Sequence, residues 1–394
     1  MENITPLLAG EKLLDALRVK PLYDESIRAA TSEERLLALN DLYDVFHPTL
    51  MTCEIYTKLY LAYIRAMKKK RSKEATQQGY LNHSKARCDG IIGGGDSFTI
   101  IGASGVGKSS SISRAISVIT NGVQNICVIP FLVVQTPCDA SLKGLLLEVL
   151  RLVDDALETR YYRDATRAGA TTDLLIGLVS QVCLNHIGVL VVDEAQNLLA
   201  KNGKNLVSGL VQLINNSGIS LVFVGTLESK KFFESAFHLA RRSVGLECSK
   251  MGFDDNFISL CEELFRYQYT RHRTALTHHL VEWLYLHSKG IVAIVVGLLH
   301  AAQEIAILSD LERVDVTTLE MAYKQRFQML HNYLYNDNRQ VLTPKKTTHM
   351  KEFTSTKSDD EFCSFATFAM GAKASKNPIE YLKQQNIVEV IALC

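Results

Sequence analysis

The stretch that decides the fold is Ser97-Phe98-Thr99-Ile100-Ile101-Gly102-Ala103-Ser104-Gly105-Val106-Gly107-Lys108-Ser109-Ser110. It begins with a short apolar run typical of a buried β-strand and continues with the pattern G-x-x-x-x-G-K-[ST] at the start of a helix. Glycines in such a loop let backbone N–H groups converge on phosphate oxygens, and the helix N-terminus adds its positive end. The residues predicted to bind a nucleotide are Gly102, Ala103, Ser104, Gly105, Val106, Gly107, Lys108, Ser109 and Ser110. Because the lysine of this motif reaches the β- and γ-phosphates and its serine ligates Mg²⁺, the implied cofactors are ATP and Mg²⁺.

A second apolar run, Gly188-Val189-Leu190-Val191-Val192, ends in the acids Asp193 and Glu194. The end of such a strand lies at the carboxyl edge of a parallel sheet, where ligands bind. We predict that Asp193 contributes to the nucleotide site and to the Mg²⁺ shell, and that Glu194 polarises an attacking water. A structural role for the two acids is the alternative, although buried carboxylates are costly without a cation.

A third apolar run, Leu221-Val222-Phe223-Val224-Gly225, carries Thr226 at its tip. If this strand lies between the strand at 97–101 and the strand at 187–192, Thr226 faces the γ-phosphate and orients the hydrolytic water. Threonine ends many strands, so this prediction depends on the strand order.

The spacing of the apolar runs predicts an α/β fold. The runs at 97–101, 126–134, 187–192 and 220–224 alternate with helical patterns, which indicates a parallel sheet covered on both faces. The predicted organisation is a helical N-terminal region at 1–96 for partner contacts, a nucleotide-binding core at 97–253, a helical lid at 254–336, and a polar, partly disordered tail at 337–394.

The composition limits the kinds of partner. The 394 residues carry 43 Lys and Arg against 42 Asp and Glu, so any nucleic-acid surface must be a local patch. No apolar run reaches the ~20 residues that span a bilayer, and residues 1–17 lack the layout of a signal peptide. We therefore expect no membrane partner. The nine cysteines are scattered without a CxxC pair, which favours a reducing cytoplasm.

Arg241 and Arg242 end a helical stretch and allow two interpretations. A guanidinium grips phosphate oxygens through two donors, which suits an arginine finger supplied to a neighbouring subunit. The same pair at a helix end also neutralises backbone carbonyls. If the finger interpretation holds, each active site lies between two subunits.

Several stretches, in their order and spacing, resemble the TnsC and TniB family of AAA+ ATPase regulators of transposition, and in particular its TnsC branch. The resemblance extends from Ser97 to about Asn332, and its lid pattern, Ser288–Val296, also fits the TnsC branch. The other stretches that carry it are Gln135-Thr136-Pro137-Cys138-Asp139-Ala140-Ser141-Leu142-Lys143, Asp193-Glu194-Ala195-Gln196-Asn197-Leu198, Val224-Gly225-Thr226 and Ala240-Arg241-Arg242.

The resemblance implies an AAA+ core with strand order 5-1-4-3-2 and an all-α lid. It implies a bacterial ATPase that assembles as a ring or helical filament on duplex DNA, and that links a target selector (TniQ- or TnsD-like, or an RNA-guided complex) to a TnsA/TnsB-like transposase. It makes Arg241 the first finger candidate and Arg242 the second, and it places Lys143 and one of Thr171 or Thr172 against the phosphate backbone. Such contacts position a protein without reading sequence.

One departure from many AAA+ proteins concerns the lid. The segment Gly290–Leu299 contains no sensor arginine. Ile294 or Val295 stands near the expected position, and Lys289 is a candidate substitute.

The same phosphate-binding loop and acidic pair are compatible with other classes of protein. A replication initiator or helicase loader is the main alternative, and it usually adds a winged-helix module for which residues 340–394 are too few and too polar. A signalling NTPase would need repeat arrays, and a metabolic kinase would need a second basic cluster; neither pattern is evident in the sequence.

Overall fold

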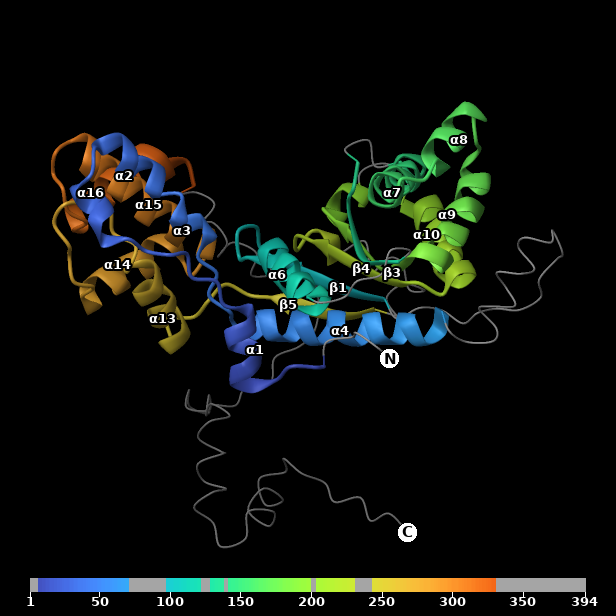
Figure 1. Ribbon diagram of the computed structural model, residues 1–394, viewed down its shortest axis with the longest axis horizontal. Coiled ribbons are helices and arrows are strands. Elements are labelled where there is room, and N and C mark those ends of the chain that lie inside the picture. Colours follow the sequence, from blue (N-terminus) through green and yellow to red (C-terminus); the bar gives the residue numbers. More distant parts are fainter. Residues whose placement is uncertain are drawn as a thin grey trace, which may run out of the picture. The chain divides into compact units, whose positions relative to one another are not determined.

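The computed structural model describes residues 6–70, 97–121, 128–137, 141–199, 203–230 and 243–330 (Figure 1). These residues all belong to one compact unit, Met1–Asn338. The predicted tail at 337–394 and the arginine pair Arg241-Arg242 lie outside the described residues. The division into four functional regions stays a prediction.

A five-stranded parallel sheet forms the centre of this unit. Its strands are β1 (Ser97–Gly102), β2 (Ile129–Gln135), β3 (Ile187–Asp193), β4 (Ser220–Gly225) and β5 (Ser243–Cys248). They lie in the order β2-β3-β4-β1-β5, which confirms the predicted order 5-1-4-3-2. β4 therefore lies between β1 and β3, the condition on which the role of Thr226 depends.

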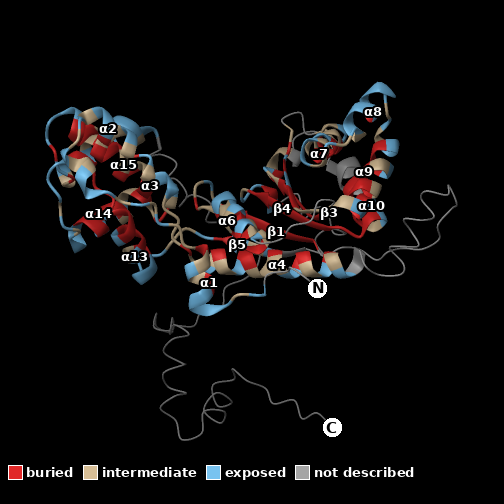
Figure 2. Ribbon diagram, viewed as in Figure 1, coloured by how far each residue is buried: buried red, intermediate tan, exposed pale blue. Residues whose placement is uncertain are grey.

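The central strands are apolar on both faces of the sheet. Successive side chains of a strand point to opposite faces, so such a strand needs an apolar residue at nearly every position. In β3, Val189 and Val191 pack on one face, while Leu190 and Val192 pack on the other. All four are buried, and so are β1 and β4 along their whole length (Figure 2), whereas the edge strand β2 exposes Val133. This explains why the strands appear in the sequence as continuous apolar runs.

Helices from different parts of the chain cover the two faces. One face packs against α7 (Leu142–Leu157), α9 (Thr172–His186) and α10 (Gly203–Ser217), and α8 (Tyr161–Arg167) packs against α7 in the same core. The other face packs against α1 (Gly10–Leu17), α4 (Leu50–Lys70) and α6 (Lys108–Thr120), and Figure 1 shows α4 running along the sheet. A short 3-10 helix, η2 (Ala195–Leu199), follows β3.

The helices after β5, which were predicted to form a lid and are called the lid below, build most of a second hydrophobic core. The lid comprises α13 (Asp255–Leu264), α14 (His278–Ser288), α15 (Val292–Leu308) and α16 (Val316–Ala322), followed by a π-helical turn η3 (Tyr323–Phe327) and a 3-10 turn η4 (Gln328–Leu330). Within the described residues no single helix is long and apolar enough to cross a membrane. Only α14 and α15 together reach that length and composition, and they are bent by 119°.

The N-terminal segment contributes to both cores. Leu13, Leu17 and Ile55 pack with the sheet, whereas Leu39 and Leu42 pack with the lid. The elements between α1 and α4 are a 3-10 helix η1 (Glu25–Ala29), α2 (Ser32–Ala38) and α3 (Asp41–Asp44). The described part of the first 96 residues is thus physically part of the core and the lid, in addition to any partner contacts it makes.

A buried ion pair fixes α2 to the lid. The Arg35 guanidinium donates to both carboxylate oxygens of Glu312, at 2.6 and 2.8 Å. Arg35 is only 1% exposed, and its hydrogen bonds hold the pKa of Glu312 below its usual range. Thr31 and Glu34 form a capping box that starts α2 and sets the position of Arg35 one turn later.

Candidate functional site

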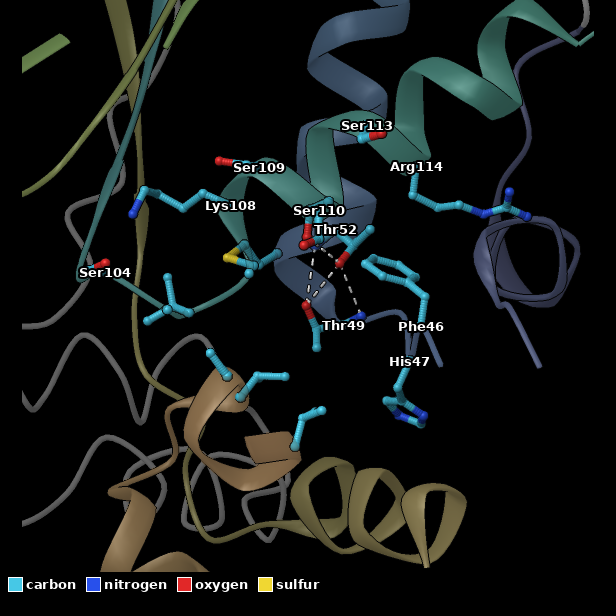
Figure 3. A pocket seen from close by; sticks show the side chains of 18 of the residues that line it. Phe46, His47, Thr49, Thr52, Ser104, Lys108, Ser109, Ser110, Ser113 and Arg114 are labelled. Atoms are coloured by element: carbon cyan, nitrogen blue, oxygen red, sulfur yellow. Dashed lines mark hydrogen bonds between the residues drawn. The ribbon is translucent and has the colours of Figure 1, made fainter. Parts of the chain in front are cut away.

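One cavity of about 940 Å³ lies at the carboxyl edge of the sheet (Figure 3). Its walls come from the glycine-rich loop and α6, the ends of β3 and β4, the N-terminal segment and the lid. The predicted residues that line it are Ser104, Gly105, Val106, Gly107, Lys108, Ser109, Ser110, Asp193, Glu194 and Thr226. The structure therefore brings these residues together around one space.

The backbone of the glycine-rich loop adopts a conformation that few other residues tolerate. Gly105 and Gly107 have φ angles of +80° and +95°, in the left-handed region. Gly107 stands at the N-cap of α6, so the first N–H groups of that helix remain available for a phosphate.

Gly102 is required for a different reason. It pairs with Cys248 of β5, and a Cβ atom at position 102 would lie 2.3 Å from the Cys248 carbonyl oxygen. Glycine therefore lets the end of β1 approach β5 closely. Burial raises the pKa of the Cys248 thiol to about 11, so this cysteine acts as a small apolar side chain.

Lys108 is held against its own loop. Its Nζ donates to the carbonyl oxygens of Gly102, at 2.9 Å, and Ala103, at 2.8 Å. Burial lowers the pKa of Lys108, while Asp193 and Glu194 oppose that change. A partly buried ammonium with only carbonyl partners gains from an anion in the cavity, which is the property expected of a phosphate-binding lysine.

Ser109 and Asp193 fit the coordination that Mg²⁺ prefers. The Ser109 hydroxyl donates to Asp193 Oδ2 over 3.2 Å, so two oxygen ligands already lie side by side. Among the described residues, no group of three His, Cys, Asp or Glu side chains is placed to hold a metal. Mg²⁺ usually takes one or two protein oxygens and completes its shell with water and phosphate oxygens, so the two ligands are sufficient.

Glu194 occupies a strained backbone position directly after β3. Its φ angle is +56°, a conformation unusual for a residue with a side chain. Its N–H donates to Asp193 Oδ1 at 2.8 Å, and its carbonyl accepts from Asn197 N at 2.9 Å. These bonds fix the turn and leave the carboxylate exposed at the mouth of the cavity.

Thr226 carries a buried hydroxyl for which the described residues provide no hydrogen-bond partner. A buried hydroxyl without a partner is costly, and a water or a ligand oxygen in the cavity would supply the missing bond. The role of orienting a water stays a prediction.

Gln196 is a site residue that the sequence did not reveal. It appears in the stretch Asp193–Leu198, but no spacing rule assigns it a role. In the structure it lines the cavity and bonds to both Glu194 and Thr226. The only sequence signal was its place two residues after the predicted base.

The N-terminal segment and the lid also line the cavity, which local sequence patterns did not predict. Phe46, His47, Thr49 and Thr52 lie around it, as Figure 3 shows. Thr52 Oγ1 lies 3.1 Å from Ser111 Oγ, and this hydrogen bond links α4 to α6.

The lid reaches the glycine-rich loop through its backbone. Ala293 N, in the first turn of α15, donates to the Gly105 carbonyl over 3.1 Å. Val292, Ala293 and Val296 line the cavity, whereas Ile294 and Val295 are buried in the lid. The expected sensor position therefore does not face the cavity, and Lys289 ends α14 in a left-handed conformation without lining it.

The candidate DNA-binding residues lie away from the cavity. Lys143 is exposed in the first turn of α7, and Thr171 is the N-cap of α9, where its hydroxyl accepts a hydrogen bond from Leu174 N. Thr172 begins α9 and is partly exposed. Thr171 thus already has a structural role as a helix cap. Lys143 and Thr172 have no capping role and remain candidates for contact with DNA.

Comparison with known proteins identifies the core. Residues 92–233 match a family model described as an AAA domain. The match covers about a third of the chain. Together with the strand order and the glycine-rich loop, it shows that the core has the AAA+ P-loop fold. No curated protein sequence matches the chain.

Several solved structures resemble the chain at low sequence identity. The Aeropyrum pernix ORC1 protein in complex with DNA has 14% identity and a TM-score of 0.46, with 64% of each chain covered. The Drosophila ORC bound to DNA has 13% identity and a TM-score of 0.46, with 81% of this chain and 70% of that chain covered. The Aeropyrum pernix ORC2 protein has 15% identity and a TM-score of 0.42, with 64% and 67% covered. The chain spans less than two thirds of the ORC1 chain.

Proposed function

We propose that this protein is a Mg²⁺-dependent ATPase. The observation that carries the proposal is that Ser109, Asp193, Glu194 and Thr226, from three separate stretches of the sequence, surround one cavity beside the glycine-rich loop. A bound Mg²⁺ would neutralise charge on the triphosphate. Ser109 and Asp193 would hold that cation, and Lys108 would leave its carbonyl partners to contact phosphate oxygens.

The remaining cavity residues suit the hydrolytic step. Glu194 is exposed and would accept a proton from a water in the cavity. The Thr226 hydroxyl would hold that water in line. Arg241 and Arg242 complete the proposal as finger candidates that a neighbouring copy supplies, with Arg241 first.

For the biological role, we propose ATP-dependent assembly of the chain on duplex DNA as a transposition regulator. The support is the resemblance to TnsC proteins, together with the exposed Lys143 and the partly exposed Thr172 at the starts of α7 and α9. Such contacts are independent of base sequence, and many copies along a duplex would add up to strong, salt-sensitive binding. A target selector and a transposase would then recognise the assembled form.

An ATPase assay on the full chain tests the proposed reaction. We expect phosphate release that requires Mg²⁺, stops on chelation, and increases with duplex DNA. Lys108→Ala is the matched negative variant, because it removes the phosphate-binding ammonium without touching Glu194. Phosphate release that Lys108→Ala leaves unchanged would place the activity elsewhere.

A second assay separates the transposition role from the replication alternative. With a partner transposase and a target selector, the transposition proposal predicts insertion only when this chain and ATP are present. Loading of a replicative helicase onto DNA, without any effect on insertion, would favour the initiator or helicase-loader interpretation instead.

A further inference from the structure

The amide side chain of Gln196 joins the Glu194 carboxylate to the backbone of Thr226, the two residues expected to handle the attacking water. Its Nε2 donates to Glu194 Oε2, and its Oε1 accepts from Thr226 N over 3.1 Å. The orientation of the amide follows from its partners, because a carboxylate only accepts and a backbone N–H only donates. One side chain therefore spans from the end of β3 to the end of β4.

The surroundings of Gln196 are built to allow this double contact. A Cβ atom at position 225 would lie 3.0 Å from Gln196 Oε1 and 2.2 Å from Ser229 Oγ. Glycine at position 225 thus leaves the space that Gln196 needs beside β4. On the other side, the fixed turn at Glu194 brings its carboxylate within reach of the same amide.

We propose that Gln196 is a positioning residue for hydrolysis, which sets the Glu194 carboxylate and the backbone that carries the Thr226 hydroxyl at a fixed separation across the cavity. This inference rests on the proposed ATPase function and deepens it. The two groups stand on different strands, and the described residues show no direct bond between them. Without the amide, each would move with its own strand end, and an offset of about 1 Å can cost ~100-fold in rate.

Three substitutions separate positioning from simple support of the loop. Gln196→Asn keeps the amide but shortens it, so it cannot hold both partners. Gln196→Ala removes both bonds. Gln196→Glu keeps the length and still accepts from Thr226 N, but places a second carboxylate beside Glu194. Asn197→Ala is the control, because its side chain does not line the cavity and its backbone bond to Glu194 is retained.

The experiment measures kcat, KM and the pH profile of ATP hydrolysis, with binding of a fluorescent ATP analogue in parallel. We expect Gln196→Asn and Gln196→Ala to lower kcat by roughly tenfold to a hundredfold with KM and analogue binding within about twofold of wild type. We expect Gln196→Glu to move the acidic limb of the kcat profile to higher pH, because neighbouring carboxylates raise the pKa of one of them. That shift reports on Glu194 as the base, whereas the positioning role is tested by the fall in kcat at nearly unchanged KM and analogue binding.

The outcomes distinguish this inference from the proposed function. If the wild-type chain hydrolyses ATP and Gln196→Ala has the same kcat, the positioning role alone is overturned. The positioning role is also overturned if Gln196→Ala loses analogue binding as strongly as it loses kcat. A wild-type chain that binds the analogue but hydrolyses no ATP, with Mg²⁺ and duplex DNA present, would overturn both proposals.

Discussion

At the scale of single residues, the proposed chemistry depends most on Glu194. Its strained backbone, with φ at +56°, is held by two hydrogen bonds from its neighbours, and its carboxylate is exposed beside Asp193. Left-handed backbone at a residue with a side chain costs about 1–3 kcal/mol, and such positions concentrate at functional sites. The turn separates the two acids, so that Asp193 faces Ser109 while Glu194 remains available for a water.

Glu194→Gln tests whether Glu194 acts on the water while Asp193 and Ser109 hold Mg²⁺. The amide cannot accept a proton from water, whereas Ser109 and Asp193 still hold Mg²⁺. We expect ATP hydrolysis to fall by about 10²–10⁴-fold, with nucleotide binding retained and the DNA-bound assembly longer-lived. Phosphate release and nucleotide binding, measured on the same preparation, check both parts. A variant that hydrolyses at the wild-type rate would remove Glu194 from the role of base.

The sequence predicted the residues of the site that act through local geometry. Gly102–Ser109 and Asp193-Glu194 are recognisable because the strand end, the loop and the helix start are contiguous in the chain. Gln196 and Thr52 escaped prediction because their contacts with Thr226 and Ser111 join separate elements, and His47 because it reaches the cavity only through the fold. Thr226 lies between these cases, since its predicted role depended on the strand order, which the structure confirms.

At the scale of elements, the N-terminal helices pack against the lid and form an ion pair with it. Thr31 and Glu34 form the capping box that starts α2. The partner of α2 could not be predicted, because Arg35 and Glu312 are 277 residues apart. The same holds for the hydrogen bond between Ala293 N and the Gly105 carbonyl, which links the lid to the phosphate-binding loop without a sensor arginine.

Arg35→Ala should destabilise the protein in a pH-dependent way. Removing one partner of a buried pair leaves Glu312 without its main cation, which costs about 3–5 kcal/mol near neutral pH. The pKa of Glu312 is lowered in the folded state, so its contribution is present above the pKa of the unfolded carboxyl and is lost as pH falls through the folded value. The difference in urea midpoint between wild type and Arg35→Ala should therefore shrink in acid.

A matched control for this measurement is Arg313→Ala. Arg313 pairs with Asp315 over 3.0 Å, but its side chain is 64% exposed, so its loss should cost less than about 1 kcal/mol. A midpoint difference for Arg35→Ala that is equal at neutral and acid pH would show that Arg35 stabilises the protein by packing alone.

Lys143→Ala tests the DNA-facing elements. Lys143 is exposed in the first turn of α7, and removing a phosphate-binding ammonium there would weaken binding equally for all DNA sequences. We expect the slope of the logarithm of the binding constant against the logarithm of salt concentration to become shallower by about one for each phosphate that the protein no longer neutralises. Arg151→Ala is the control, because Arg151 is already paired with Glu148 and Asp155 on the same helix. Unchanged binding of Lys143→Ala at every salt concentration would remove Lys143 from the interface.

At the scale of the whole molecule, the near balance of 43 basic and 42 acidic residues matters most. A chain with so little net charge has no net long-range attraction for DNA, so the proposed binding would use a local patch and would be strengthened by many copies acting together. The proposal assigns the finger that a neighbouring copy supplies to Arg241 or Arg242. Nucleotide and DNA would then favour the same assembled state, and each would strengthen binding of the other.

Sedimentation velocity of the full chain tests nucleotide-dependent assembly on DNA most directly. The chain would be measured alone, with a slowly hydrolysed ATP analogue and Mg²⁺, with a duplex long enough for several copies, and with both together. The proposal predicts large complexes when analogue and duplex are both present, and none for Lys108→Ala under the same conditions. Wild-type protein that remains monomeric with both ligands in excess would contradict it.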